Sequence, residues 1–179
     1  MNDYYLIIWD LGISGKTALV SASSAGLGFA SAQALAEAGC KTVISGRNEE
    51  RLMHAANKIP NSIPVIADVS TVKGSQALVQ DAKSQLGTNI DILITNAGGP
   101  PAGTFASTDV DQYLTAIELN LMSVVAMCKE TVPDMQEKKW GRVLAITSIS
   151  VRQPIPNIML SNTARAVSYT HLRAHETSA

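Results

Sequence analysis

A short turn containing two glycines is the first candidate for chemistry in this sequence. The stretch "SASSAGLG", residues 21 to 28, follows an apolar run and opens an Ala-rich segment. Gly26 and Gly28 add little side-chain bulk, so a pyrophosphate could approach the backbone N–H groups and the positive end of a helix. Tight packing of a strand against a helix would also use two glycines here, and the pair alone does not separate these interpretations.

Charged residues after two further apolar runs bear on the same chemistry. Gly46 and Arg47 follow "KTVIS", and an arginine beside an uncharged residue accommodates the additional phosphate of NADP, whereas a carboxylate there would bind the ribose hydroxyls of NAD. The sequence therefore favours NADP, with NAD still open. Arg47 could also be a solvated arginine at a strand end. Asp68 could accept a hydrogen bond from the adenine amine or cap the following helix.

These residues sit in a regular alternation of short apolar runs and helical patterns. Strands buried on both faces read as continuous apolar runs, and strand–helix alternation at this spacing predicts right-handed βαβ units. The sequence thus predicts a Rossmann-like α/β domain, a doubly wound parallel sheet between two layers of helices. Predicted strands cover 16–22, 41–46, 63–69, 91–98 and 141–148, and predicted helices cover 26–39, 48–59, 72–86 and 109–131, the last ended by Pro133.

Composition narrows the classes of partner. The 179 residues, 46% of them hydrophobic, predict one domain with a sizeable core. A net charge of -1 gives no electrostatic footprint for nucleic acid or an anionic membrane. Cys40 and Cys128 lie far apart without metal-ligand spacing, so we expect reduced core cysteines in a cytoplasmic protein.

In combination the motifs resemble the short-chain dehydrogenases/reductases, with the nearest resemblance to bacterial members labelled 3-oxoacyl-acyl-carrier-protein reductase-like. "SASSAGLG", "ADVS", "NAGG" at 96–99, "ELNLMS" at 118–123 and "GRVLAITS" carry this resemblance over about residues 10–166. It implies hydride transfer between NAD(P)H and a small-molecule carbonyl or alcohol, with a 3-oxoacyl thioester as one candidate. The cofactor site that it implies consists of Ser21, Ser23, Ser24, Gly26, Leu27, Gly28, Arg47, Asp68, Val69, Asn96, Ala97 and Gly98.

The same resemblance assigns two polar residues to catalysis. Asn120 matches the helix asparagine that holds a proton-relay water, and Ser148 matches the serine that hydrogen-bonds the substrate carbonyl. Asn120 could instead be a polar residue that kinks its helix, and Ser148 an ordinary serine at a strand end.

Two departures from the family pattern stand out. The phosphate turn begins with Ser21 and Ala22, where the family has Thr-Gly. Ser161 and Arg165 occupy the positions of the family's catalytic tyrosine and lysine. An aliphatic hydroxyl is a much weaker acid than a phenol, and arginine stays charged, so loss of the positioned acid predicts a rate lower by about 10²- to 10⁴-fold.

The chain end offers a second tyrosine, which we do not expect to be catalytic. Tyr169 lies eight residues beyond Ser161, about 12 Å along a helix. Residues 167–179 resemble a translated sequencing adapter and predict a break within the active-site helix, which would leave the domain of residues 10–166 incomplete at its C-terminal side. The pair His171 and His175 belongs to this tail, and residues 1–9 are expected to be an N-terminal extension.

Two functional hypotheses follow. The first is a fragment of an NADP-linked oxidoreductase whose full-length parent would transfer hydride, with this chain itself expected to be inactive; the retained Asn120 and Ser148 favour it. The second is a non-catalytic dinucleotide-binding or oligomerisation module, favoured by Ser161 and Arg165. For the full-length parent, the resemblance further implies a homo-oligomer that pairs through the long helix and the helix after it, whereas the break in that second helix would weaken assembly of this chain. The apolar residues of the long helix could equally be buried within the domain.

Overall fold

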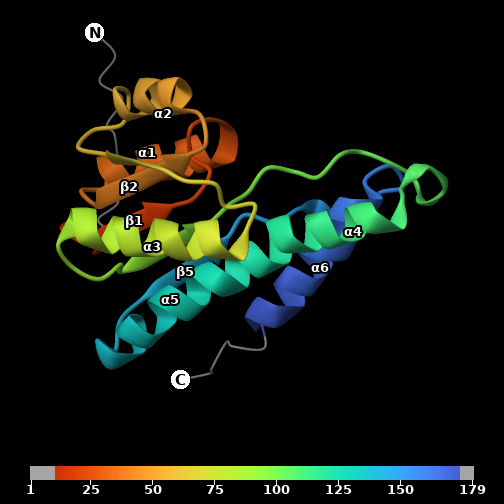
Figure 1. The fold of residues 1–179 in the computed structure, drawn as a ribbon. Helices are drawn as coiled ribbons and strands as arrows, with labels where there is room; N and C mark the ends of the chain where they lie inside the picture. Colours follow the sequence, from red (N-terminus) through yellow and green to blue (C-terminus); the bar gives the residue numbers. More distant parts are fainter. Residues whose placement is uncertain (1–10, 174–179) are drawn as a thin grey trace, which may run out of the picture.

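The protein folds as a five-stranded parallel sheet between helices in a computed structural model that describes residues 11–173 (Figure 1). The N-terminal extension expected at 1–9 and the last part of the expected tail lie outside this range. The strands are β1 (Thr17–Val20), β2 (Lys41–Gly46), β3 (Ile63–Ile66), β4 (Ile92–Thr95) and β5 (Arg142–Ala145). The α-helices are α1 (Gly26–Glu37), α2 (Glu49–Ala56), α3 (Val72–Leu86), α4 (Val110–Ile117), α5 (Ser123–Glu137) and α6 (Met159–Arg173).

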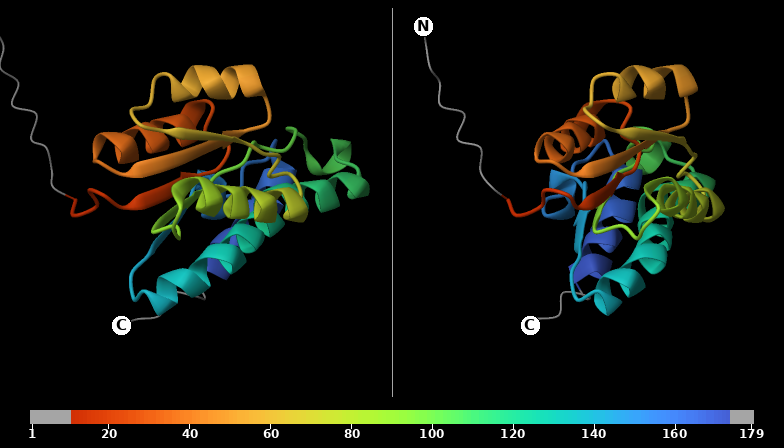
Figure 2. Two further views of the ribbon diagram at one scale, coloured as in Figure 1. Left: turned by 60° about the vertical axis from the view of Figure 1, so that its left-hand side comes forward. Right: turned by 90° about the vertical axis from the view of Figure 1, so that its left-hand side faces the viewer.

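The sheet has the order β3-β2-β1-β4-β5 and all its strand pairs are parallel, which confirms the predicted doubly wound fold. Successive residues of β1 point to opposite faces, and each face has its own apolar core. Leu19 packs with residues of α3 and α5, whereas Ala18 and Val20 pack with residues of α1 and α2. Figure 2 shows the resulting layers, with α6 alongside α4 and α5.

The ends of α2 and α3 carry capping residues that can be recognised in the sequence. The Thr71 side chain accepts a hydrogen bond from Gly74 N at the start of α3, and Gly87 ends that helix with φ of 70°. At α2, the Asn48 side chain accepts from Arg51 N. Such caps satisfy backbone groups that a helix end would otherwise leave unpaired, so the bounds of α3 agree with the prediction.

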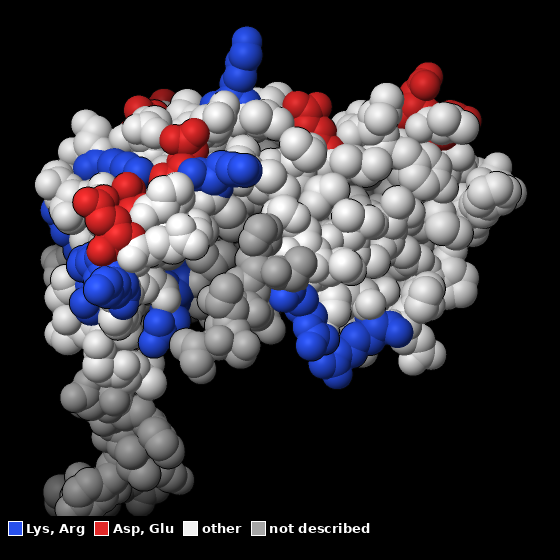
Figure 3. Space-filling model, turned by 90° about the horizontal axis from the view of Figure 1, so that it is seen from below, with Lys and Arg blue, Asp and Glu red and all other residues white. Residues whose placement is uncertain are grey.

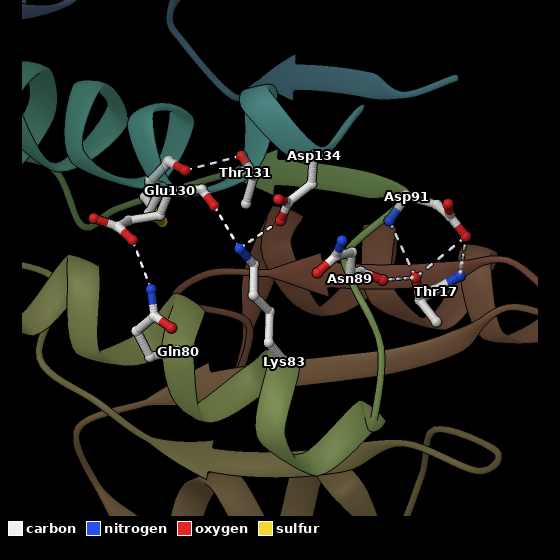
Figure 4. Close-up of polar contacts among 9 residues, drawn as sticks. Thr17, Gln80, Lys83, Asn89, Asp91, Glu130, Thr131 and Asp134 are labelled. Carbon is white, nitrogen blue, oxygen red and sulfur yellow. Dashed lines mark hydrogen bonds and ion pairs between the residues drawn. The ribbon is translucent and has the colours of Figure 1, made fainter. Parts of the chain in front are cut away.

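The predicted end of the long helix at Pro133 is wrong. The helical chain from Val110 to Glu137 is continuous, with Pro133 inside α5, and a π-helical turn (Glu118–Met122) separates α4 from α5. Lys83 of α3 donates from Nζ to the carbonyl oxygen of Glu130 at 2.7 Å and pairs with the Asp134 carboxylate, so α3 holds the chain on both sides of the proline (Figure 4). These tertiary contacts outweigh the local preference of proline to end a helix.

Helix α6, which carries Ser161 and Arg165, starts at Met159 and continues past residue 166 to Arg173. Ala116 of α4 forms a small core with Leu160 and Ala164 of α6, so the two helices lie side by side (Figure 1). No helix in the described range is both long enough and apolar enough to cross a membrane.

Candidate functional site

The loops after β1 and β4 meet at the carboxyl edge of the sheet, where the strand order changes direction. β1 has β2 on one side and β4 on the other, and ligands of open α/β sheets bind at such a switch point. The Ser21 hydroxyl donates to the carbonyl oxygen of Asn96 at 2.6 Å and accepts from Asn96 N at 2.8 Å. The Asn96 amide donates to the carbonyl oxygen of Ala22 at 3.0 Å. Asn96 therefore fixes the glycine-containing turn against β4.

The predicted phosphate turn leads into an uncapped helix N-terminus that is open to solvent at Gly26. Helix α1 begins without a side-chain cap and without acidic residues in its first turn. At Gly26, whose φ is 62°, an added Cβ would meet no atom within 4 Å, and Leu27 beside it is exposed. At Gly28, an added Cβ would lie 2.7 Å from both the Ala22 carbonyl oxygen and Asn96 Nδ2. The helix end is thus open on its outer side and closely packed on its inner side.

Ala22, where the family has glycine, adopts a left-handed backbone conformation. Its φ is 46°, and its N–H donates to the Ser45 hydroxyl at 3.1 Å. The left-handed region costs a non-glycine residue about 1–2 kcal/mol, because its Cβ approaches the following carbonyl oxygen. Hydrogen bonds with Ser45 and Asn96 hold Ala22 in this conformation despite the cost.

Several predicted cofactor residues support the turn from behind. Ser21 and Ser23 are fully buried, and the Ser23 hydroxyl donates to the carbonyl oxygen of Val20 at 2.7 Å and accepts from Ser45 N at 2.9 Å. Val69 is buried in the core between the sheet and α3. Ser24 is only half-buried, and its side chain lies next to Gly46 at the end of β2. Of these four side chains, Ser24 is the one that solvent or a ligand can reach.

Arg47 and Asp68 follow β2 and β3 and lie side by side. The Arg47 Nε and Asp68 Oδ1 atoms are 3.9 Å apart, and both side chains are exposed. The Asp68 carboxylate accepts a hydrogen bond from Ser70 N at 3.0 Å. This backbone bond, opposed by partial burial and assisted by the Arg47 charge, lowers the pKa of Asp68. The sequence prediction placed both residues at the adenosine end of the site, and the structure brings them together.

Asn120 lies in the π-helical turn and is 4% exposed. Its side-chain amide donates to the carbonyl oxygen of Gly98 at 3.1 Å, and its backbone carbonyl accepts from the Ser168 hydroxyl at 2.6 Å. Its Oδ1 atom is buried without a hydrogen-bond partner in the described part of the chain. An unpaired buried acceptor costs free energy, so this oxygen is a natural anchor for a water molecule.

Helix α6 carries Ser161 and Arg165 one turn apart, next to the ends of β4 and β5. Arg165 Nη1 donates to the carbonyl oxygens of Ile146 at 2.9 Å and Thr147 at 3.4 Å, and Nη2 donates to that of Ala97 at 3.5 Å. Burial lowers the pKa of Arg165, which remains charged at any accessible pH. Ser161 is buried. The guanidinium thus bonds backbone from both loops that border the predicted active site.

The candidate catalytic serine, Ser148, follows Ile146 and Thr147, the two residues after β5 whose carbonyl oxygens accept from Arg165. It is half-buried, and its hydroxyl accepts from Ser150 N at 3.1 Å. The structure therefore gathers Asn96, Ala97, Gly98, Asn120, Ser148 and Arg165 at one edge of the sheet, through the contacts given above.

Tyr169 does not join this group. Its hydroxyl accepts from Arg173 Nη1 at 2.9 Å. This bond, together with the nearby Arg152, lowers the pKa of Tyr169. Among residues 11–173 no group of three or more His, Cys, Asp or Glu side chains could hold a metal ion, and His175 lies outside that range.

Sequence reasoning missed Ser45. Its hydroxyl accepts from Ala22 N, and its backbone N–H donates to the Ser23 hydroxyl. The one available signal was a polar residue interrupting an apolar strand directly before Gly46. A polar residue in a strand buried on both faces must find a partner, and here the partner is the phosphate turn.

The chain is similar in sequence and in fold to known oxidoreductases. An oxidoreductase of Bacillus subtilis (strain 168) of uncharacterized activity, YvaG, is 34% identical over 151 residues, which are 80% of this chain and 55% of that protein. L-sorbose reductase from Gluconobacter frateurii, solved with NADPH and L-sorbose, is 30% identical with a TM-score of 0.86, covering 92% of this chain and 64% of that one.

A third relative has a site described as unusual. It is the NADPH-bound short chain oxidoreductase from Pseudomonas aeruginosa PAO1 containing an atypical catalytic center, 25% identical with a TM-score of 0.82, covering 89% of this chain and 64% of that one. The chain thus spans little more than half the length of YvaG and less than two thirds of either solved chain. The model of the short chain dehydrogenase family matches residues 16–168, and this chain belongs to that family.

Proposed function

We propose that the chain binds a nicotinamide dinucleotide, NADP in preference to NAD, and that the protein transfers hydride between this cofactor and a carbonyl or alcohol group of a small molecule. The observation that carries the proposal is the open N-terminus of α1 at the switch point of the sheet, built from Gly26 and Gly28 and fixed by Asn96. Backbone N–H groups and the helix dipole there favour a pyrophosphate.

The residues present fit such a cofactor. An added Cβ at Gly26, Gly98 or Gly99 would meet no atom within 4 Å, so the border of the site is open. Arg47 supplies the cation that a ribose phosphate would need. The bound nicotinamide ring would supply or accept the hydride, while this chain's residues would position the reactants. The NADPH present in L-sorbose reductase and in the oxidoreductase from Pseudomonas aeruginosa supports this assignment.

Ser148 and Asn120 would serve the reacting carbonyl. The Ser148 hydroxyl would donate a hydrogen bond to the substrate oxygen, and the unpaired Asn120 Oδ1 would hold a water from which a proton reaches the site. Ser161 corresponds to the family's catalytic tyrosine, and a serine hydroxyl is a much weaker acid than a phenol. A 3-oxoacyl thioester stays a prediction from the family resemblance, since nothing in the described site distinguishes it from other carbonyl compounds.

A specific observation favours the alternative, a non-catalytic dinucleotide-binding module. Arg165 directs its donors at three backbone carbonyls, as a structural residue would. Fluorescence titration of this chain with NADPH and NADH, followed by turnover assays of a version extended to the length of its relatives with a panel of carbonyl compounds, separates the two. Binding with turnover supports the oxidoreductase, binding without turnover supports the module, and absence of binding overturns both.

We also propose that the protein forms a homo-oligomer through α4 and α6. Val110 and Leu114 are four residues apart on α4 and are 82% and 72% exposed, and Phe105 just before them is exposed as well. In the view from below (Figure 3), a broad uncharged surface lies on the right, between acidic side chains along its upper edge and basic side chains along its lower edge. An exposed apolar patch of this kind favours contact between copies.

A further inference from the structure

The ion pair between Arg47 and Asp68 links the ends of two neighbouring strands at the adenosine side of the proposed site. Arg47 follows β2 directly, and Asp68 lies two residues beyond the end of β3. Their closest charged atoms are 3.9 Å apart, and the side chains are 74% and 52% exposed. The pair is therefore accessible to a ligand on the surface of the molecule.

Packing at Gly46 leaves Asp68 as the carboxylate that faces Arg47. An added Cβ at Gly46 would lie 3.2 Å from both Cβ and Oγ of Ser24, so the strand end has no room for an acidic side chain unless Ser24 moves. The end of β2 thus presents the Ser24 hydroxyl and the Arg47 guanidinium. The negative charge opposite Arg47 is that of Asp68, in the loop after the neighbouring strand β3.

Asp68 is held more firmly than Arg47. Its Oδ1 accepts from Ser70 N at 3.0 Å, in a turn that begins at Asp68 itself, whereas the contact with Arg47 is longer than a hydrogen bond. When a ligand with a phosphate approaches, the arginine side chain is the partner free to turn, and the carboxylate stays in place. Any phosphate bound by Arg47 must then compete with the fixed Asp68 carboxylate for the guanidinium.

We propose that Asp68 is a specificity-determining residue that reduces the preference of this site for NADPH over NADH. This inference rests on the proposed function. Asp68 neutralises Arg47 when the ribose carries no phosphate, and it competes with the 2′-phosphate for the guanidinium when the ribose carries one. Exposed ion pairs are weak, so the competition reduces NADPH affinity without preventing binding. The site consequently accepts both nucleotides, with a smaller difference between them than Arg47 alone would give.

Nucleotide titrations of charge variants test the inference, with the ratio of Kd for NADH to Kd for NADPH as the readout. We expect Asp68→Asn to raise this ratio about threefold to tenfold at low ionic strength. Arg47→Gln should lower the ratio, and Asp68→Asn in the Arg47→Gln background should change it less than about twofold, because Asp68 acts through Arg47. Glu50→Gln, an identical charge change in the first turn of α2, is the control and should leave the ratio unchanged.

Three results overturn the inference. One is an unchanged or lower ratio in Asp68→Asn; another is an equal effect with and without Arg47; the third is an equal effect of Glu50→Gln. Asp68→Ser, which also keeps an oxygen for Ser70 N, repeats the test with a second side chain should the asparagine variant fold poorly. If neither nucleotide binds the unsubstituted chain, the proposed function itself is wrong, which is a different outcome from binding with an unchanged ratio.

Discussion

Arg165 Nη1 donates to the carbonyl oxygen of Ile146 at 2.9 Å and thereby joins α6 to the loop after β5. The same guanidinium reaches Ala97 in the loop after β4, so one side chain connects three segments of the site. Arginine suits this role because its donors form a rigid planar fork. A lysine ammonium at this position would offer a compact charge and could not span the same acceptors.

Arg165→Ala is expected to destabilise the fold. Removal of the guanidinium leaves partly buried carbonyl oxygens without their donor, at a cost of about 1–3 kcal/mol in the free energy of unfolding. Urea titration followed by circular dichroism measures this change. Arg51→Ala on the exposed side of α2 is the control and should lie within about 0.5 kcal/mol of the unsubstituted chain. Equal stabilities of the two variants would contradict the assigned role.

The double variant Ser161→Tyr/Arg165→Lys tests the catalytic positions. If these two residues occupy the places of the family's tyrosine and lysine, a phenol with a neighbouring ammonium should raise carbonyl reduction by about 10²- to 10⁴-fold. NADPH oxidation with a panel of carbonyl compounds measures the rate. Arg165→Lys alone is the control and should show little gain, since it lacks the acid. A double variant that binds NADPH and shows no gain argues against this correspondence.

Ala22→Gly is expected to stabilise the protein. Glycine adopts the φ of 46° without the Cβ contact that strains alanine, and part of that gain is offset by the greater freedom of glycine in the unfolded chain. The net increase should be about 0.5–1 kcal/mol by urea unfolding. Ala30→Gly, on the exposed side of α1, is a matched substitution in helical backbone and should have the opposite sign. Destabilisation by both would refute the strain at Ala22.

The lowered pKa of Asp91 should make the stability of the fold depend on pH. Burial alone would raise the pKa of Asp91, but bonds from Lys138 Nζ and from the N–H and hydroxyl of Thr17 lower it overall (Figure 4 shows the Thr17 contacts). A lowered pKa stabilises the fold above the unfolded-state value of about 3.9, and this stabilisation is lost as pH falls through the folded-state pKa.

Asp91→Asn should therefore cost about 1–3 kcal/mol at pH 7 and progressively less below about pH 4. Urea titrations at a series of pH values measure the difference between the variant and the unsubstituted chain. Asp81→Asn on the exposed side of α3 serves as the control and should show little effect at any pH. A difference for Asp91→Asn that persists unchanged in acid would rule out the charge as its cause.

Leu114→Lys tests the proposed contact between copies. A charge at the centre of an apolar contact is expected to lower the association constant by at least about tenfold, because the ammonium must be desolvated without a partner. Light scattering after size-exclusion chromatography measures the molar mass. Met53→Lys, on the exposed surface of α2, should leave the mass unchanged. A monomeric unsubstituted chain would contradict the proposal directly.

Local signals predicted much of the fold. β2 and α3 match the expected ranges because their ends carry strong signals, such as the Thr71 cap and Gly87. The end of the long helix at Pro133 was wrong because Lys83, far away in sequence, holds α5 on both sides of that residue. The π-helical turn was also not expected, although Asn120 was recognised as a residue that could kink its helix.

The composition of the site was more predictable than the direction of its side chains. Residues that follow the strands were expected at the carboxyl edge, and Arg47, Asp68 and Asn96 lie there. Which hydroxyls point inward depends on partners in other strands, so the burial of Ser21 and Ser23 and the contribution of Ser45 could not be read from spacing. The acceptors of Arg165 likewise belong to two distant loops.

The bond between Ser21 and Asn96 has a consequence for the order of folding. These residues are separated by 75 positions, and the turn that they fix is strained at Ala22, so the first βα unit cannot hold that turn by local forces alone. Non-local contacts of this kind form only after the entropy of closing a long loop has been overcome. The nucleotide-binding geometry should consequently appear late in refolding, when β4 docks beside β1, and not with the collapse of the first strands and helices.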